Sequence, residues 1–262
     1  SDPAFIADVK KAHEQADRVQ ELIEFNEGIP PEGALSLLYT DPLTQGPRLF
    51  ASNCASCHAY GYDDAGHPLD GTNKKLTDKQ SAPDLKGLGS REWISKVLTV
   101  EHYESDQFFG NTKFKEGKML EFLVDTELEE EDVEGLAAAL SSEAKLKSQS
   151  DIDNNDTELI ANGFEWMGED ELACTDCHKV KGDGGKKGPD LTGYMSRQWL
   201  IDFIGNSSHE RFYGDDNDRM PNFLDAVDSE GEIKPGKLDQ KSVELIVDWL
   251  RGEYADKKVT EK

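Results

Sequence analysis

The chain has 262 residues, enough for two domains that each bury a core. Asp and Glu number 54 against 29 Lys and Arg, so the formal charge is -25 and a phosphate backbone would be repelled. These values argue against nucleic-acid binding, and no apolar run approaches the roughly 20 residues that a membrane helix needs. The acidity then reflects a solvated surface, solubility in a salty medium, or attraction of a basic partner.

The first 40 residues are predicted to hold one amphipathic helix and a connector. Apolar residues from Phe5 to Ile23 recur at helical spacing. Helix breakers follow in "GIPPEGAL", and Asp41-Pro42 is predicted to begin the next unit. Such a helix either packs on the rest of the protein as part of the scaffold, or it forms an extended stalk or a contact surface for a partner.

Two short motifs use every cysteine in the chain. They are Cys54-Ala-Ser-Cys57-His58 and Cys174-Thr-Asp-Cys177-His178. On a helix, two cysteines and a histidine at i, i+3 and i+4 share one face. The thiols can form thioethers to the two vinyl groups of a porphyrin while the imidazole binds iron, and this spacing is the signature of c-type haem attachment. We therefore predict two covalently attached haem c groups, with His58 and His178 as iron ligands.

Zinc binding and thiol chemistry are the alternatives for these motifs. Paired CxxC zinc ligands normally converge within one small module, whereas these pairs lie in separate halves of the chain and each precedes a histidine. A redox CxxC would need a βαβ setting, and none is predicted around either motif. Covalent haem is favoured over both.

The same landmarks follow each motif, which indicates an internal duplication. "APDLKGLGSREW" and a segment ending at Met119 follow the first motif, and "GPDLTGYMSRQW" and a segment containing Met220 follow the second. A helical apolar pattern precedes each motif and another closes each copy. These patterns span 46–53, 159–167, 130–140 and 240–250. They predict short helices around a ligand wrapped by loops.

From about residue 43 to 254 this arrangement resembles the class I cytochromes c, here as a dihaem protein. The resemblance implies an all-α fold of two tandem class I cytochrome c domains preceded by an N-terminal amphipathic helix. The implied boundaries are 1–40 for the helix and connector, 41–147 and 148–256 for the two haem c domains, and 257–262 for a tail. It also implies that the N-terminal and C-terminal helices of each unit cross.

The resemblance further implies the remaining site residues. The carbonyls of Pro83 and Pro189 would accept hydrogen bonds from the proximal imidazoles and so orient them. A late methionine would complete each iron, Met119 in the first unit and Met220 in the second. A thioether at this position is soft and neutral, and it raises the reduction potential.

Several features leave the axial ligands open. Met220 precedes a proline as in the family, whereas Met119 does not, and His102 or His209 could replace a methionine. A lone histidine in a polar loop is more often solvated, and this alternative applies to His67 as well. The remaining candidates have packing as the plain alternative. They are Met167, Met195, Trp93 and Trp199. The closing helix of the first unit also lacks a counterpart of Trp249, the aromatic expected at the helix crossing.

The N-terminal helix and connector (1–40), together with the start of the first haem c domain, resemble the segment that joins a membrane cytochrome b to its haem c domains in some bacterial bc-type quinol-oxidising complexes. This resemblance implies a respiratory electron carrier, not itself an enzyme, or a domain of a quinol:cytochrome c oxidoreductase. Its partners would be a membrane cytochrome b-type complex and a c-type cytochrome or oxidase. Haem c is attached in the periplasm or on the outer face of the membrane, so we expect a processed or excised soluble domain. The alternative is a dihaem cytochrome c peroxidase-type enzyme, in which one iron has an open sixth position.

Overall fold

The structure is a computed structural model that describes residues 2–63, 65–70, 72, 79–168, 171–227 and 231–255. It is mostly helical, in agreement with the predicted all-α class. The helices are α1 (Pro3–Phe25), α2 (Pro42–Asn53), α3 (Arg91–Val97), α4 (Val100–Tyr103), α5 (Lys118–Thr126), α6 (Glu130–Ala144), α7 (Ser150–Asn155), α8 (Thr157–Trp166), α9 (Arg197–Gly205) and α10 (Gln240–Leu250). The predicted tail, 257–262, lies outside the described residues.

Two short antiparallel hairpins interrupt the helices. They are formed by β1 (Lys179–Val180) with β2 (Asp183–Gly184), and by β3 (Ala226–Val227) with β4 (Ile233–Lys234). In the first, Lys179 lies opposite Gly184, and in the second Ala226 lies opposite Lys234. The sequence patterns did not predict either hairpin, because strands of two residues carry no measurable alternation.

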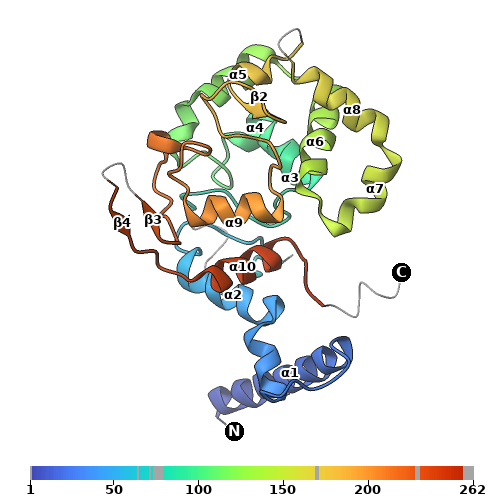
Figure 1. The fold of residues 1–262 in the computed structure, drawn as a ribbon, viewed down its shortest axis with the longest axis vertical. Helices are drawn as coiled ribbons and strands as arrows, with labels where there is room; N and C mark the ends of the chain where they lie inside the picture. Colours follow the sequence, from blue (N-terminus) through green and yellow to red (C-terminus); the bar gives the residue numbers. More distant parts are fainter. Residues whose placement is uncertain are drawn as a thin grey trace.

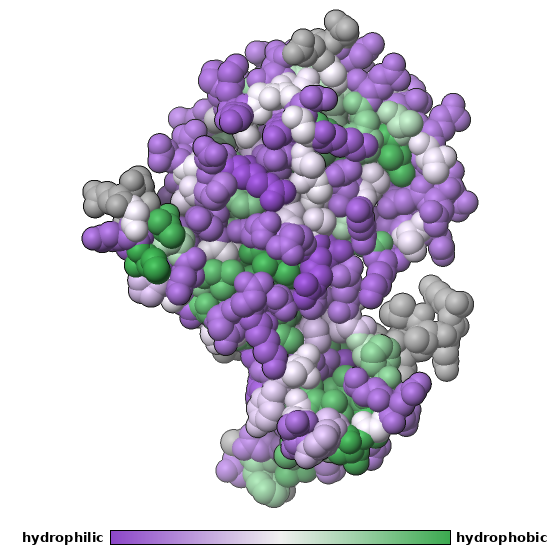
Figure 2. Space-filling model, viewed as in Figure 1, coloured by the Kyte–Doolittle hydropathy of each residue, from purple (hydrophilic) through white to green (hydrophobic). Residues whose placement is uncertain are grey.

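Helix α1 forms a separate lobe at the N-terminal end of the molecule (Figure 1). A small core of Val19, Leu22 and Leu38 packs it against the connector. The Arg18 guanidinium lies 2.7 Å from a carboxylate oxygen of Asp41, which is itself the N-cap of α2. Figure 2 shows further apolar side chains exposed on this lobe. None of the helices in the described part of the chain is both long enough and apolar enough to cross a bilayer.

The helix before the first motif, α2, packs against the last helix, α10. Gly46 lies directly against the Trp249 side chain, so that a Cβ added to this glycine would overlap the indole. The Trp249 ring also lies 5.3 Å from the Phe50 ring and 4.1 Å from the Tyr60 ring, measured between centroids. The absence of a side chain at Gly46 therefore lets a large aromatic residue fill the crossing.

The helix before the second motif, α8, packs against α6, which closes the first copy. Gly163 faces the backbone of Gly135 so closely that a Cβ on Gly163 would overlap the Gly135 carbonyl. The Trp166 ring lies over Gly135. At this crossing the aromatic residue comes from α8, and the closing helix α6 contributes glycine and alanine. This explains why no counterpart of Trp249 is present in α6.

The expectation that the two terminal helices of each copy cross one another is therefore wrong. Each copy's first helix packs against the other copy's last helix, α2 with α10 and α6 with α8, as Figure 1 shows. The α6–α8 pair is local, because only residues 145–156 separate the two helices, and such short connections cost little loop-closure entropy. Once α6 and α8 are paired, α2 and α10 remain to cover each other.

The remaining helices extend this exchange into two halves. Helix α3 packs on α6, and α9 packs on α10. One half therefore holds α3 to α6 with α8, and the other holds α2, α9 and α10, seen in the upper and lower parts of the main body in Figure 1. One continuous apolar core connects both halves. The boundaries at 41, 147 and 256 remain predictions about the sequence repeat.

Buried Arg251 holds the two halves together. Its guanidinium donates to the carbonyl of Ala144 at 2.9 Å and to that of Met195 at 2.6 Å, and it also pairs with Glu253 at 2.7 Å. A cation at this place opposes the negative end of the α6 helix dipole. Met195 in turn touches Gly89, its counterpart in the first copy, so the two equivalent turns meet at the junction.

Candidate haem sites

The first motif continues directly from the end of α2. The Cys54 N–H donates to the Phe50 carbonyl at 2.8 Å, and the His58 N–H donates to the Cys54 carbonyl at 2.9 Å. This single turn brings the two half-buried cysteines and the histidine together. The His58 Nδ1–H donates to the Pro83 carbonyl at 2.7 Å. An imidazole oriented in this way presents Nε2 as its metal-binding nitrogen.

The second motif has the same geometry on a different local frame. Cys174 begins a short 3-10 turn, and the His178 N–H donates to the Cys174 carbonyl at 2.9 Å. The His178 Nδ1–H donates to the Pro189 carbonyl at 2.8 Å. Gly188 lies behind the ring, where an added Cβ would be 2.6 Å from Cε1. The structure thus brings each motif histidine to the proline named from its sequence.

The tryptophans Trp93 and Trp199 hold the turns that carry these prolines. The Trp93 Nε1–H donates to the Asp84 carbonyl at 2.8 Å, and the Trp199 Nε1–H donates to the Asp190 carbonyl at 2.8 Å. The structure therefore gives both indoles a positioning contact in addition to packing. In each copy the tryptophan follows the aspartate by nine residues, and this equal spacing was the signal available in the sequence.

Replacing the indole with a phenyl ring should loosen the proximal turn in either copy. We expect Trp199→Phe to lower the free energy of unfolding by about 1–2 kcal/mol, because the half-buried Asp190 carbonyl loses its indole donor. Trp93→Phe should cost a similar amount. Urea denaturation followed by circular dichroism measures both. Trp199→Ala adds a cavity and should cost about 3–5 kcal/mol in total. Unchanged stability in both Phe variants would contradict the positioning contact.

The environment of the thiols favours anchoring over thiolate chemistry. Burial raises the pKa of Cys54 to about 12 and that of Cys174 to about 11. Redox exchange needs the thiolate, which burial of these two thiols disfavours, whereas a thioether sulfur carries no charge. Within the described ranges, no three His, Cys, Asp or Glu side chains gather as metal ligands. The donor set thus fits covalent haem attachment, with the imidazole as the iron ligand.

The two candidate methionines occupy different settings. Met119 is the second residue of α5, is half-buried, and packs against the cluster of Tyr103, Leu120 and Leu123. Met220 is half-buried in a loop. Its carbonyl accepts hydrogen bonds from the Ser207 hydroxyl and the Asn217 amide. The other two methionines, Met167 and Met195, are buried in the core, as their packing interpretation predicts.

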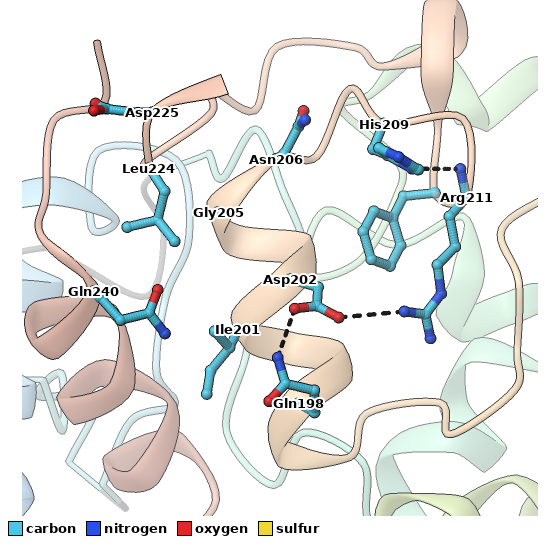
Figure 3. Close-up of a pocket in the computed structure, with 11 residues that line it drawn as sticks. Gln198, Ile201, Asp202, Gly205, Asn206, His209, Arg211, Leu224, Asp225 and Gln240 are labelled. Carbon is cyan, nitrogen blue, oxygen red and sulfur yellow. Dashed lines mark hydrogen bonds and ion pairs between the residues drawn. The ribbon is translucent and has the colours of Figure 1, made fainter. Parts of the chain in front are cut away.

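The histidines that could replace a methionine are exposed. His102 lies on the surface of α4, and His67 pairs with Asp63 at 3.0 Å. His209 accepts a hydrogen bond at Nδ1 from the Arg211 backbone N–H at 3.1 Å. This last contact closes a local turn, as Figure 3 shows.

His209 and Arg211 line a surface hollow of about 430 Å³ beside α9 (Figure 3). The carboxylate of Asp202 bridges Gln198 and Arg211 across its wall. None of the motif residues, the two turn prolines or the candidate methionines lines this hollow. It is therefore separate from the motif residues of both candidate haem sites.

Comparison with known proteins bears directly on the first of these sites. Residues 43–142 match the cytochrome c family model. The match begins at the second residue of α2 and ends within α6, so it includes the first motif, its proline turn and Met119. It supports a c-type cytochrome with covalently bound haem c, redox protein partners and a role in electron transfer. No curated protein and no solved structure matches the chain.

The cytochrome c match does not extend to the second copy. The second haem therefore rests on the repeated motif and on the geometry that the two sites share. That geometry is the motif turn, the histidine-to-proline hydrogen bond and the indole-to-aspartate hydrogen bond.

Proposed function

We propose that the chain binds two haem c groups, one at each motif, and carries single electrons between them and external partners. The haems supply the redox chemistry. The chain's own residues anchor them, orient the imidazoles and exclude water. The observation that carries this proposal is the repeated hydrogen bond from each motif histidine to a proline carbonyl, 2.7 Å in one copy and 2.8 Å in the other.

Methionine as the sixth ligand of both irons supports electron transfer rather than catalysis. Met119 and Met220 are half-buried and lie beside the core, whereas the competing histidines are exposed. Two neutral thioethers would keep both sixth positions occupied and raise the potentials. A peroxidase would need one of these positions open, and no feature of the described residues favours that.

The proposed partners are a membrane quinol-oxidising complex of the bc type as donor and a c-type cytochrome or oxidase as acceptor. The support is the resemblance of the N-terminal helix and connector, together with the start of the first haem c domain, to the segment that follows cytochrome b in such complexes. The net charge of -25 would attract a partner with a basic docking face and speed its association at low salt. The corresponding location is the periplasm or the outer face of the membrane.

The haem count tests this proposal. Mass spectrometry of the denatured full chain should show the added mass of two haems, because thioether bonds survive unfolding. The double variant Cys54→Ala/Cys57→Ala should carry one haem, and Cys174→Ala/Cys177→Ala should carry the other. A zinc-loaded chain without haem, or two haems remaining in either variant, would overturn it. Peroxide turnover at the rate of dedicated peroxidases would favour the enzyme instead.

A further inference from the structure

The first motif lies in the half of the protein that contains α9 and α10. The Cys54 N–H donates to the Phe50 carbonyl of α2, and the Phe50 ring packs on the Trp249 ring of α10. Helix α9 packs on α10 in the same half. Both α9 and α10 belong to the second copy of the repeat. The immediate helical surroundings of the first motif are therefore supplied largely by the second copy.

The second motif lies in the half that contains α3 to α6. The Thr175 N–H donates to the Met167 carbonyl at 3.0 Å, so the motif is attached to the end of α8, and α8 packs on α6. The hairpin strand β2 lies against the motif, because a Cβ on Gly184 would overlap the His178 carbonyl. Figure 1 shows β2 in the same upper part as α4, α5 and α8.

Each candidate methionine lies in the half that holds the motif of the other copy. Met119 is in α5, which packs on α4 and leads directly into α6. Two hydrogen bonds attach the segment that contains Met220 to the end of α9. The Ser207 hydroxyl donates to the Met220 carbonyl, and the Phe223 N–H donates to the Ile204 carbonyl at 3.1 Å. The Leu238 N–H then binds the Phe223 carbonyl just before α10 begins. Met220 therefore belongs to the half that holds the first motif.

We propose that each iron takes its sixth ligand from the other copy of the repeat. Met220 is assigned to the haem anchored by Cys54 and Cys57, and Met119 to the haem anchored by Cys174 and Cys177. The inference rests on the proposed function, since it presumes two haems with methionine ligands. It replaces the pairing expected from repeat order, in which Met119 serves the first motif and Met220 the second.

The exchange of methionine ligands follows from the point at which each copy of the repeat passes from one half of the protein to the other. The proline turn of each copy stays with its own motif, through the contacts His58 to Pro83 and His178 to Pro189. The helix after each turn, α3 or α9, packs in the other half. The crossing point is the turn where Gly89 touches Met195. Residues near Gln107 and Arg211 stay with their own copy, because the Asp84 N–H donates to the Gln107 carbonyl and the Asp190 N–H to the Arg211 carbonyl, each at 2.8 Å. The methionine and the closing helix come later in the chain, and these are the parts that we assign to the neighbouring site.

Single-haem variants of the full chain test this assignment. In Cys174→Ala/Cys177→Ala only the first haem remains, and its ferric sulfur-to-iron charge-transfer band reports the methionine. Adding Met220→Ala should abolish the band completely, while adding Met119→Ala should leave it intact. In Cys54→Ala/Cys57→Ala the two methionine variants should exchange their effects. Electron paramagnetic resonance of the same samples provides an independent record of axial ligation.

The opposite pattern, with Met119 needed by the first haem, would overturn the exchange and leave the dihaem function intact. A band that persists in both the Met119→Ala and the Met220→Ala variants would also overturn the exchange, because the ligand would then be neither of these methionines. Absence of haem from the parent chain would instead remove the proposed function.

If a single-haem variant does not fold, the two-haem chain provides the same assignment. Nuclear Overhauser contacts should join the Met220 methyl group to the haem bonded to Cys54. Contacts to the haem bonded to Cys174 would overturn the proposal.

Discussion

Gly163→Val should lower the free energy of unfolding by about 3–5 kcal/mol. The added side chain would overlap the Gly135 carbonyl and contact the Ala139 methyl group, and a backbone group in a helix cannot move aside as a side chain can. Urea denaturation followed by circular dichroism measures the change. Because α8 leads into the second motif, haem attachment there should also fall, as counted by mass spectrometry.

Ala161→Val is the matched control for this substitution. It places the same β-branched side chain on α8 at an exposed position, two residues away. Its cost should be below about 1 kcal/mol, from lost helix propensity alone. Equal costs at the two positions would mean that α8 does not pack against α6 as described. Normal haem attachment at the second motif in Gly163→Val would mean that this packing does not position the motif.

Arg251→Met should lower the free energy of unfolding by about 3–5 kcal/mol, because it removes one partner of a buried network. The Glu253 carboxylate would lose its partner, and the Ala144 and Met195 carbonyls would lose their donor. Only 7% of the Arg251 surface is exposed, so water cannot replace these contacts without local opening. Hydrogen exchange should show protection lost at the end of α6 and around Met195.

Arg197→Met is the control for this second prediction. Arg197 also pairs with a carboxylate, Asp248, at 2.6 Å, but its side chain is 42% exposed. An exposed pair contributes about 0.2–1 kcal/mol, so this variant should lose no more than that. If Arg251→Met costs as little as Arg197→Met, then Arg251 does not hold the two halves together.

The cofactor chemistry could be predicted from the sequence because it is local. Two cysteines and a histidine within five residues need only one helical turn to converge, and the structure places both motifs on such turns. The proline turns are less local, since Pro83 lies 25 residues after His58 and Pro189 lies 11 residues after His178, and resemblance to a known family supplied both prolines. The repeat itself was visible from landmarks that recur in the same order. The mostly helical fold followed from apolar spacing at 46–53, 130–140, 159–167 and 240–250.

Which copies meet could not be predicted, because helices at equivalent places in a repeat have similar apolar faces. The spacing of those faces does not specify a partner. The contacts that decide it are Gly46 against Trp249 and Gly163 against Gly135, and each is a match of shape between residues distant in sequence. The absence of an aromatic residue from α6 was visible in the sequence, but its cause lies in Trp166 of the other copy.

The sequence by itself determined the anchors and the iron-binding histidines that we propose, because short spacing dictates which side chains share a turn. Only the tertiary structure decided that α2 packs on α10 and α8 on α6, and with it the half in which Met119 and Met220 lie. The physical reason is that side-chain packing, together with the short connection from α6 to α8, selects one of two pairings that equivalent helices would otherwise share.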